Sequence, residues 1–166
     1  MCAQLAVNLS ARQFQESSLV ADVRGSLQES GLPPRLLELE ITETCLMKPG
    51  EEAVNILDDI KSIGVGLTMD DFGTGYSSLT YLKRFPIDKL KIDRAFVRDP
   101  PKDANAAAIA RAIISLAESL QLRVMAEGVE TEEQLSFLQQ EGCHEMQGFL
   151  RGCPMPTSEM EKLLKP

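Results

Sequence analysis

The chain has 166 residues, of which 43% are hydrophobic, and this size suits one globular domain with a sizeable core. Its 17 lysines and arginines are outnumbered by 25 aspartates and glutamates, which gives a formal net charge of -8. That balance argues against a nucleic acid polymer as partner, because polymers are bound through broad basic surfaces. A small phosphate ligand bound through metal ions is still compatible with it.

Cysteine usage and hydropathy indicate the cellular compartment in which the chain works. The cysteines Cys2, Cys45, Cys143 and Cys153 are scattered without a C-x-x-C pair, and His144 is the only histidine. The sequence therefore predicts no zinc site, and we expect reduced, mostly buried thiols. No signal peptide is evident, and no apolar run approaches the roughly 18 residues of a membrane span. We expect a cytoplasmic domain, whether or not its parent protein is membrane-anchored.

Strand-like and helix-like segments alternate along the chain in six units. Strands are predicted at 4–9, 36–41, 65–69, 87–93, 122–127 and, more weakly, 145–149. Helices are predicted at 15–30, 51–63, 78–84, 105–120, 131–142 and 158–164. Such alternation builds a parallel sheet, either an open doubly wound sheet or a barrel. No G-x-G-x-x-G motif follows the first strand, so a dinucleotide-binding sheet has no support.

The predicted strand at 65–69 is followed directly by two carboxylates, Asp70 and Asp71, and then by Gly73 and Gly75, which allow a sharp turn. Neighbouring carboxylates repel each other unless a cation or a basic group lies between them. They are also common as ordinary turn residues before glycine. This stretch alone does not decide between the two interpretations.

Polar side chains stand at or just beyond the predicted carboxyl end of every strand. These ends meet on one face of a parallel sheet, where parallel folds build their active sites. Each residue alone could have a structural explanation, such as an exposed strand residue or a surface lysine. Six consecutive strands that all end in polar residues favour a functional site instead. The set comprises Asn8, Glu40 with Glu43, Asp70 with Asp71, Lys91 with Asp93, Glu127 and Gln147.

The set predicts metal-assisted chemistry. Carboxylate and amide oxygens without cysteine or histidine ligands suit Mg²⁺ or Mn²⁺. Adjacent aspartates can serve two ions about 3.5–4 Å apart, and a lysine among carboxylates can position a water or stabilise developing negative charge. The residues thus predict phosphodiester hydrolysis as the reaction class and do not identify the substrate.

Six motifs run across essentially the whole chain, and their order and spacing resemble those of the EAL domain family. They are Asn8-Leu9-Ser10 with Gln13-Phe14, Glu38-Leu-Glu-Ile-Thr-Glu43, Asp70-Asp-Phe-Gly-Thr-Gly-Tyr-Ser-Ser78, Lys91-Ile-Asp93, Ala126-Glu-Gly-Val-Glu-Thr131 and Gln147-Gly148. The resemblance implies a (β/α)8 barrel with one irregular, antiparallel strand. It also implies hydrolysis of the bacterial second messenger cyclic di-GMP to linear pGpG, with Mg²⁺ or Mn²⁺ as cofactor.

The resemblance further implies roles for the matching residues. Lys91 would contact the catalytic water, with Glu127 and Gln147 as further catalytic residues, and Asp93 and Gln147 would contact the substrate. The implied metal ligands are Asn8, Glu40, Asp70, Asp71 and Glu127.

The resemblance also implies a regulatory loop at residues 70–78. Glu43 would anchor this loop, which couples the site to a dimer interface in the family. The residues concerned beside Glu43 are Phe72, Gly73, Thr74 and Gly75.

The chain departs from the family pattern at two places. The Glu-Ala-Leu motif that names the family belongs upstream of Asn8 and is not in this chain. After Gln147-Gly148, Gly152 and Cys153 replace the usual aromatic-rich pattern, which weakens the expectation of guanine contacts there.

From the first departure we expect residues 1–166 to be the C-terminal three-quarters of an EAL domain, an incomplete TIM-like barrel of about six βα units. Two strands, one metal-binding glutamate and a substrate-contacting arginine would be missing. Open edges would then favour a homodimer or higher association, with weak or no activity of the fragment alone. The parent protein would carry upstream sensory or diguanylate cyclase-like domains.

Two further interpretations stay open. A non-catalytic module that binds cyclic di-GMP is favoured by the missing strands, whereas the retained Asp70-Asp71 pair, Lys91 and Glu127 favour the enzyme. A structural or dimerisation fragment would show neither binding nor hydrolysis.

Overall fold

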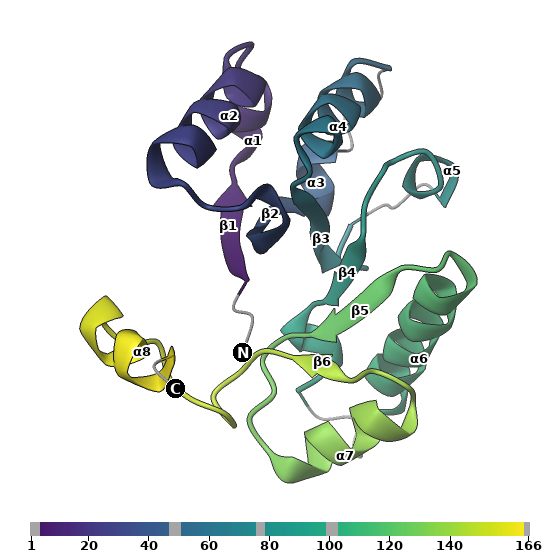
Figure 1. Cartoon of the computed structure of the whole chain (residues 1–166). Coiled ribbons are helices and arrows are strands. Elements are labelled where there is room, and N and C mark those ends of the chain that lie inside the picture. Colours follow the sequence, from purple (N-terminus) through teal and green to yellow (C-terminus); the bar gives the residue numbers. More distant parts are fainter. Residues whose placement is uncertain (1–3, 47–50, 76–78, 99–102, 165–166) are drawn as a thin grey trace.

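The computed structural model describes residues 4–46, 51–75, 79–98 and 103–164. Six strands form one curled sheet in the order β1-β2-β3-β4-β5-β6, and every pairing among them is parallel (Figure 1). Their bounds are β1 (Leu5–Leu9), β2 (Leu37–Thr42), β3 (Gly66–Phe72), β4 (Lys89–Ile92), β5 (Arg123–Ala126) and β6 (Glu145–Met146).

Apart from the last helix, which follows β6, the helices connect successive strands and lie on the outer side of the curled sheet (Figure 1). The α-helices are α1 (Ala11–Phe14), α2 (Leu19–Ser30), α3 (Glu43–Leu46), α4 (Glu51–Ile63), α5 (Leu79–Leu82), α6 (Ala104–Ser119), α7 (Glu132–Gln140) and α8 (Thr157–Leu164). Two 3-10 turns, η1 (Pro34–Leu36) and η2 (Arg94–Phe96), complete the connections. The incomplete TIM-like barrel expected from the sequence is confirmed.

Four details differ from the expectations. The helix predicted at 15–30 begins later, as α2 at Leu19, and the separate short helix α1, which Ser10 and Gln13 cap, precedes it. The strand predicted at 65–69 extends through both aspartates to Phe72. The strand predicted at 145–149 keeps two residues, and the antiparallel strand implied by the resemblance is not among the described strands. Cys153 is exposed rather than buried.

The core lies between the sheet and the outer helices. Apolar strand residues such as Ile41, Leu67 and Leu90 are fully buried, as are Leu57 and Ile60 on the inner face of α4. The same periodicities, two in strands and 3.6 in helices, made these elements predictable. The opposite, concave face of the sheet carries charged side chains instead, and these form the candidate site.

The first strand is an edge with exposed apolar residues. Leu5 and Val7 of β1 are 53% and 42% exposed. Beside them, a hollow of about 450 Å³ runs between β1 and α2.

At the other end of the described chain, α8 stands apart from the sheet (Figure 1). None of the described helices is long and apolar enough to cross a membrane.

Candidate active site

Lys91 of β4 lies at the centre of a carboxylate cluster on the concave face. Its Nζ lies 3.0 Å from Glu40 Oε2, 3.2 Å from Asp70 Oδ1 and 2.5 Å from Glu127 Oε1. The carboxylates come from β2, β3 and the residue after β5, so three strand ends converge on one ammonium group. The lysine side chain is only 2% exposed. The predicted convergence of these residues is therefore observed.

A β-bulge brings both aspartates to this face. Met69 pairs with Leu90 and Phe72 with Ile92, so β3 has one residue more than β4 over this interval. Asp71 absorbs the extra residue with a φ of 54°, a left-handed conformation that aspartate tolerates better than most residues. Side chains normally alternate between the faces of a strand. The bulge overrides that alternation.

Asp70, Asp71 and Glu127 present one carboxylate oxygen each within 4.8 Å of one another. Such a group of hard oxygen donors fits Mg²⁺ or Mn²⁺ better than zinc or copper. These three residues are therefore the described group best suited to hold a divalent ion.

The surroundings of Lys91 and Glu127 in this cluster raise the pKa of both groups. Burial alone would lower the pKa of Lys91, but hydrogen bonds to Glu127 and Glu40 outweigh burial and raise it. Burial also raises the pKa of Glu127, opposed by Lys91 and reinforced by the charges of Asp70 and Glu40. One cation thus stays charged among more carboxylates than it can neutralise.

Asp71 has a second acidic neighbour in Asp93. Burial, the charge of Asp70 and then the charge and hydrogen bond of Asp93 raise the pKa of Asp71. Asp93 is also fixed locally, because its Oδ1 accepts a 2.8 Å hydrogen bond from Ala95 N–H at the start of η2. Asp93 therefore belongs to the candidate site through Asp71.

Asn8 and Gln147 lie beside the cluster, and both are exposed. The backbone register aligns Asn8 with Glu40 across β1 and β2. Gln147 N–H donates to the carbonyl of Ala126, which holds Gln147 at the end of β5. Neither side chain has a contact with the Lys91 cluster among the interactions described, so both stay predictions as site residues.

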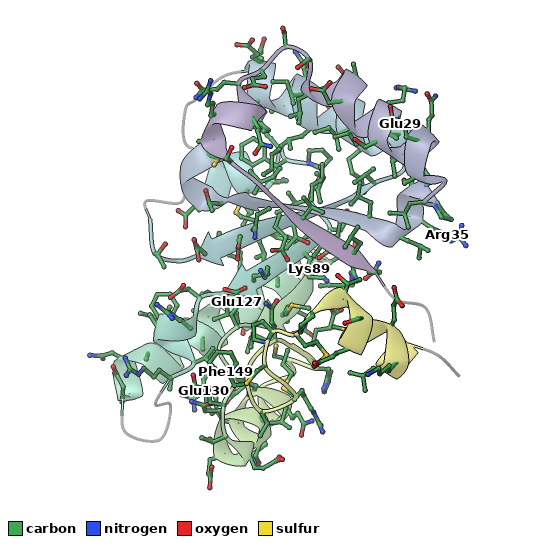
Figure 2. The ribbon with its side chains drawn as sticks, turned by 90° about the vertical axis from the view of Figure 1, so that its left-hand side faces the viewer. Glu29, Arg35, Lys89, Glu127, Glu130 and Phe149 are labelled. Atoms are coloured by element: carbon green, nitrogen blue, oxygen red, sulfur yellow. The ribbon has the colours of Figure 1, made fainter. Side chains whose placement is uncertain are left out.

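A hollow of about 210 Å³ opens next to Glu127 and is lined by Arg94, Gln147 and Phe149 among others. Glu130 and Phe149 lie in the same lower region of the molecule in Figure 2. A Cβ at Gly128 would lie 2.6 Å from Arg94 Cβ, so glycine permits this close approach. Sequence reasoning missed Arg94, although the Gly128 that follows Glu127 was a signal of backbone crowding.

Glu43 anchors the turn after β3. It is 1% exposed, and its Oε2 accepts hydrogen bonds from Gly73 N–H at 3.1 Å and Gly75 N–H at 3.4 Å. Thr74 closes the same turn by donating its hydroxyl to Asp71 O at 2.9 Å. Phe72 is buried, and residues 76–78 of the predicted loop lie outside the described part of the chain.

A second group of charges lies on the same face, beneath Lys91 in the direction of the amino ends of the strands. The sequence analysis did not predict it. It joins Lys89 to Glu38 and Glu145, with Arg123 near both carboxylates. The shared parity of Lys89 with Lys91, and of Glu38 with Glu40, could have placed it on the concave face. Figure 2 shows Lys89 and Glu127 in the middle of the molecule, with the purple and blue helices above them and the green helices below.

The fold and the site together define an α/β domain of the barrel type, with an acidic site at the carboxyl ends of its parallel strands. The family model described as "EAL domain" matches residues 2–154. The chain belongs to the EAL domain family, and the resemblance noted in the sequence is thereby confirmed.

Some of the similar proteins are named as cyclic di-GMP phosphodiesterases. The "Bifunctional diguanylate cyclase/cyclic di-GMP phosphodiesterase MucR" of Pseudomonas aeruginosa is 49% identical over 156 residues, which cover 94% of this chain and 23% of that protein. The chain thus spans about a quarter of this curated relative.

Solved structures show the same fold. A MucR phosphodiesterase structure, described as a c-di-GMP complex, superposes with a TM-score of 0.91 and 48% identity, covering 95% of this chain and 64% of that one. BlrP1 of Klebsiella pneumoniae, described as a manganese/cy-diGMP complex, superposes with a TM-score of 0.81 and 37% identity, covering 89% and 38%.

Proposed function

We propose that this chain belongs to a phosphodiesterase domain that, within a longer parent protein, hydrolyses cyclic di-GMP to linear pGpG with two divalent ions, Mg²⁺ or Mn²⁺, and that the chain alone is weakly active or inactive. The observation that carries the proposal is the Asp70, Asp71 and Glu127 oxygen set beside the buried Lys91. The names of the MucR and BlrP1 structures supply the substrate and the manganese as support.

The carboxylates Asp70, Asp71 and Glu127 would hold the ions, with Glu40 and Asn8 completing the ligand set from neighbouring strands. Ions bound there would supply charge neutralisation for the phosphodiester and activate a water. The bulge at Asp71 is what allows two consecutive aspartates to serve one site.

Lys91 would orient the attacking water and stabilise negative charge on the phosphoryl oxygens. Its raised pKa keeps it protonated, so it acts as a fixed positive charge rather than as a base. Gln147 and Asp93 would contact the substrate from the rim, with Glu127 and Gln147 assisting the water.

Glu43 would couple the site to the rest of a larger assembly. The hydrogen bonds from Glu43 to Gly73 and Gly75 fix the turn directly after Asp71. A change in this turn would therefore move Asp71, which gives residues 72–75 a regulatory role.

We place the chain, residues 1–166, as the EAL portion of a longer cytoplasmic signalling protein with sensory or diguanylate cyclase-like domains. Its 23% share of MucR's length supports this organisation. The exposed apolar edge at Leu5 and Val7 supports homodimerisation or higher association.

A receptor that binds cyclic di-GMP without hydrolysing it is the alternative, favoured by the open edge of the sheet at β1. Calorimetric titration with cyclic di-GMP, combined with chromatography of the products, separates the two functions. If the enzyme proposal holds, a longer protein that carries this chain forms pGpG with Mn²⁺ and forms none in chelator. Binding in chelator without product formation under any metal condition would establish the receptor instead.

A further inference from the structure

Beneath the Lys91 cluster, four charged side chains form a closed ring that the proposed function leaves without a role. Lys89 Nζ lies 3.0 Å from Glu38 Oε1 and 3.0 Å from Glu145 Oε2, and Arg123 lies 3.5 and 3.6 Å from the same two carboxylates. We call these four residues the lower ion ring. Lys89 and Glu38 are 3% and 5% exposed.

The lower ion ring is an unusual filling for this position. Layers of branched apolar side chains normally fill the interior of a parallel barrel. Burying ion pairs costs desolvation energy, and apolar residues of similar volume often replace them without loss of stability. Stability alone therefore gives little reason for charges here, and their position directly beneath the site suggests a role in the site.

The strand register shows what the ring prevents. Glu40, Thr68 and Lys89 occupy one row across β2, β3 and β4. Thr68 is short, and its buried hydroxyl has no hydrogen-bond partner among the described residues. Lys89 could therefore reach over Thr68 to Glu40, but it pairs with Glu38 and Glu145 while Lys91 takes Glu40.

We propose that Glu38 and Glu145 are positioning residues for the site. By holding Lys89 in the lower ion ring, they keep Glu40 free for Lys91 and for a bound divalent ion. Without them, the buried ammonium of Lys89 turns to Glu40, the carboxylate in its own row. The consequence for the ion rests on the proposed function, whereas the pairing of Lys89 does not.

A crystal structure of the Glu38→Met/Glu145→Met variant tests the pairing directly. We expect Lys89 Nζ within about 3 Å of a Glu40 oxygen. Lys89 still directed away from Glu40 would overturn the inference. If the double variant does not fold, Glu38→Met alone removes the buried carboxylate, and its structure is judged by the same criterion.

Calorimetric titration with Mn²⁺ tests the consequence. We expect the double variant to lose affinity about tenfold, as for groups that orient metal ligands. Adding Lys89→Met removes the ammonium that competes with the ion for Glu40. The Mn²⁺ affinity should then return to within about twofold of that of the native chain, because the effects of coupled residues are not additive. A triple variant as weak as the double variant would show a merely structural role and overturn the inference.

The matched control is Glu141→Met, which removes an ion-paired carboxylate (2.8 Å from Arg111) outside the site. It should leave Mn²⁺ affinity unchanged; a loss as large as that of the double variant would overturn the inference. If the native chain binds no Mn²⁺ while the crystal structure shows Lys89 on Glu40, the proposed function fails and the positioning of Lys89 stands.

Discussion

At the scale of single residues, Lys91 decides the electrostatics of the site. Its ammonium holds together Glu40, Asp70 and Glu127, which would otherwise repel each other. A buried charge whose partner is removed costs far more than a surface pair contributes. Removing Lys91 should therefore destabilise the fold, apart from any effect on a reaction at the site.

Replacing this lysine tests its effect on stability. Lys91→Met should lower the free energy of unfolding without metal by about 3–5 kcal/mol, because three crowded carboxylates lose their cation. Mn²⁺ should recover part of the loss, since a bound ion replaces the missing charge. Urea unfolding with and without Mn²⁺ measures both effects.

Lys61→Met is the control, because the Lys61–Asp88 pair at 2.8 Å is about one-third exposed. It should cost less than about 1 kcal/mol. Equal losses in the two variants would contradict the assignment of Lys91.

The raised pKa values of Asp71 and Glu127 predict a pH dependence with a definite sign. Between the ordinary and the raised pKa, the folded chain binds more protons than the unfolded chain, so these groups favour folding as the pH falls through that window. Divalent ions need the ionised carboxylates and compete with these protons. Mn²⁺ should therefore raise the melting temperature more at about pH 8 than at about pH 5. Thermal unfolding at both values checks this, and equal shifts would refute it.

At the scale of elements, the site depends on how β3 ends. The bulge at Asp71 brings Asp70 and Asp71 to the same face of the sheet. Glu43 at the start of α3 then fixes the turn that follows them through hydrogen bonds. A buried carboxylate that accepts two backbone N–H groups fixes a turn more firmly than water can. The precision of the site therefore comes from an interaction between α3 and the end of β3.

Hydrogen exchange can test the Glu43 anchor. In Glu43→Ala, the amides of Gly73 and Gly75 lose their acceptor and should exchange at least about tenfold faster, the effect of losing a hydrogen bond of about 1.4 kcal/mol. Glu43→Gln keeps one carbonyl oxygen and should retain most of the protection. Unchanged protection in Glu43→Ala would show that the turn holds itself.

At the scale of the whole molecule, the open sheet leaves β1 as an edge with Leu5 and Val7 exposed. Exposed apolar edges tend to pair with other chains. Sedimentation across micromolar concentrations should show association, and Leu5→Lys/Val7→Lys should weaken it because edge charges oppose pairing. A native chain that stays monomeric throughout would contradict this.

The same scale explains what the sequence could predict. Periodicity placed the sheet and the main helices, and the parallel order then placed Glu40, Asp70, Lys91 and Glu127 on one face. The bulge at Asp71 could not be predicted, because it depends on how β3 pairs with β4 rather than on local preference. The lower ion ring was also missed, since it joins residues up to 107 positions apart, from Glu38 to Glu145.

The rate of pGpG formation from cyclic di-GMP in Mn²⁺ tests the proposed phosphodiesterase function most directly. The assay compares a longer protein that carries this chain with its Asp70→Asn variant, because Asp70 contacts Lys91 and belongs to the oxygen set. We expect turnover by the native protein, none in chelator, and a loss of at least about 100-fold in the variant. Turnover that survives the substitution, or no turnover by the native protein, would contradict the proposed function.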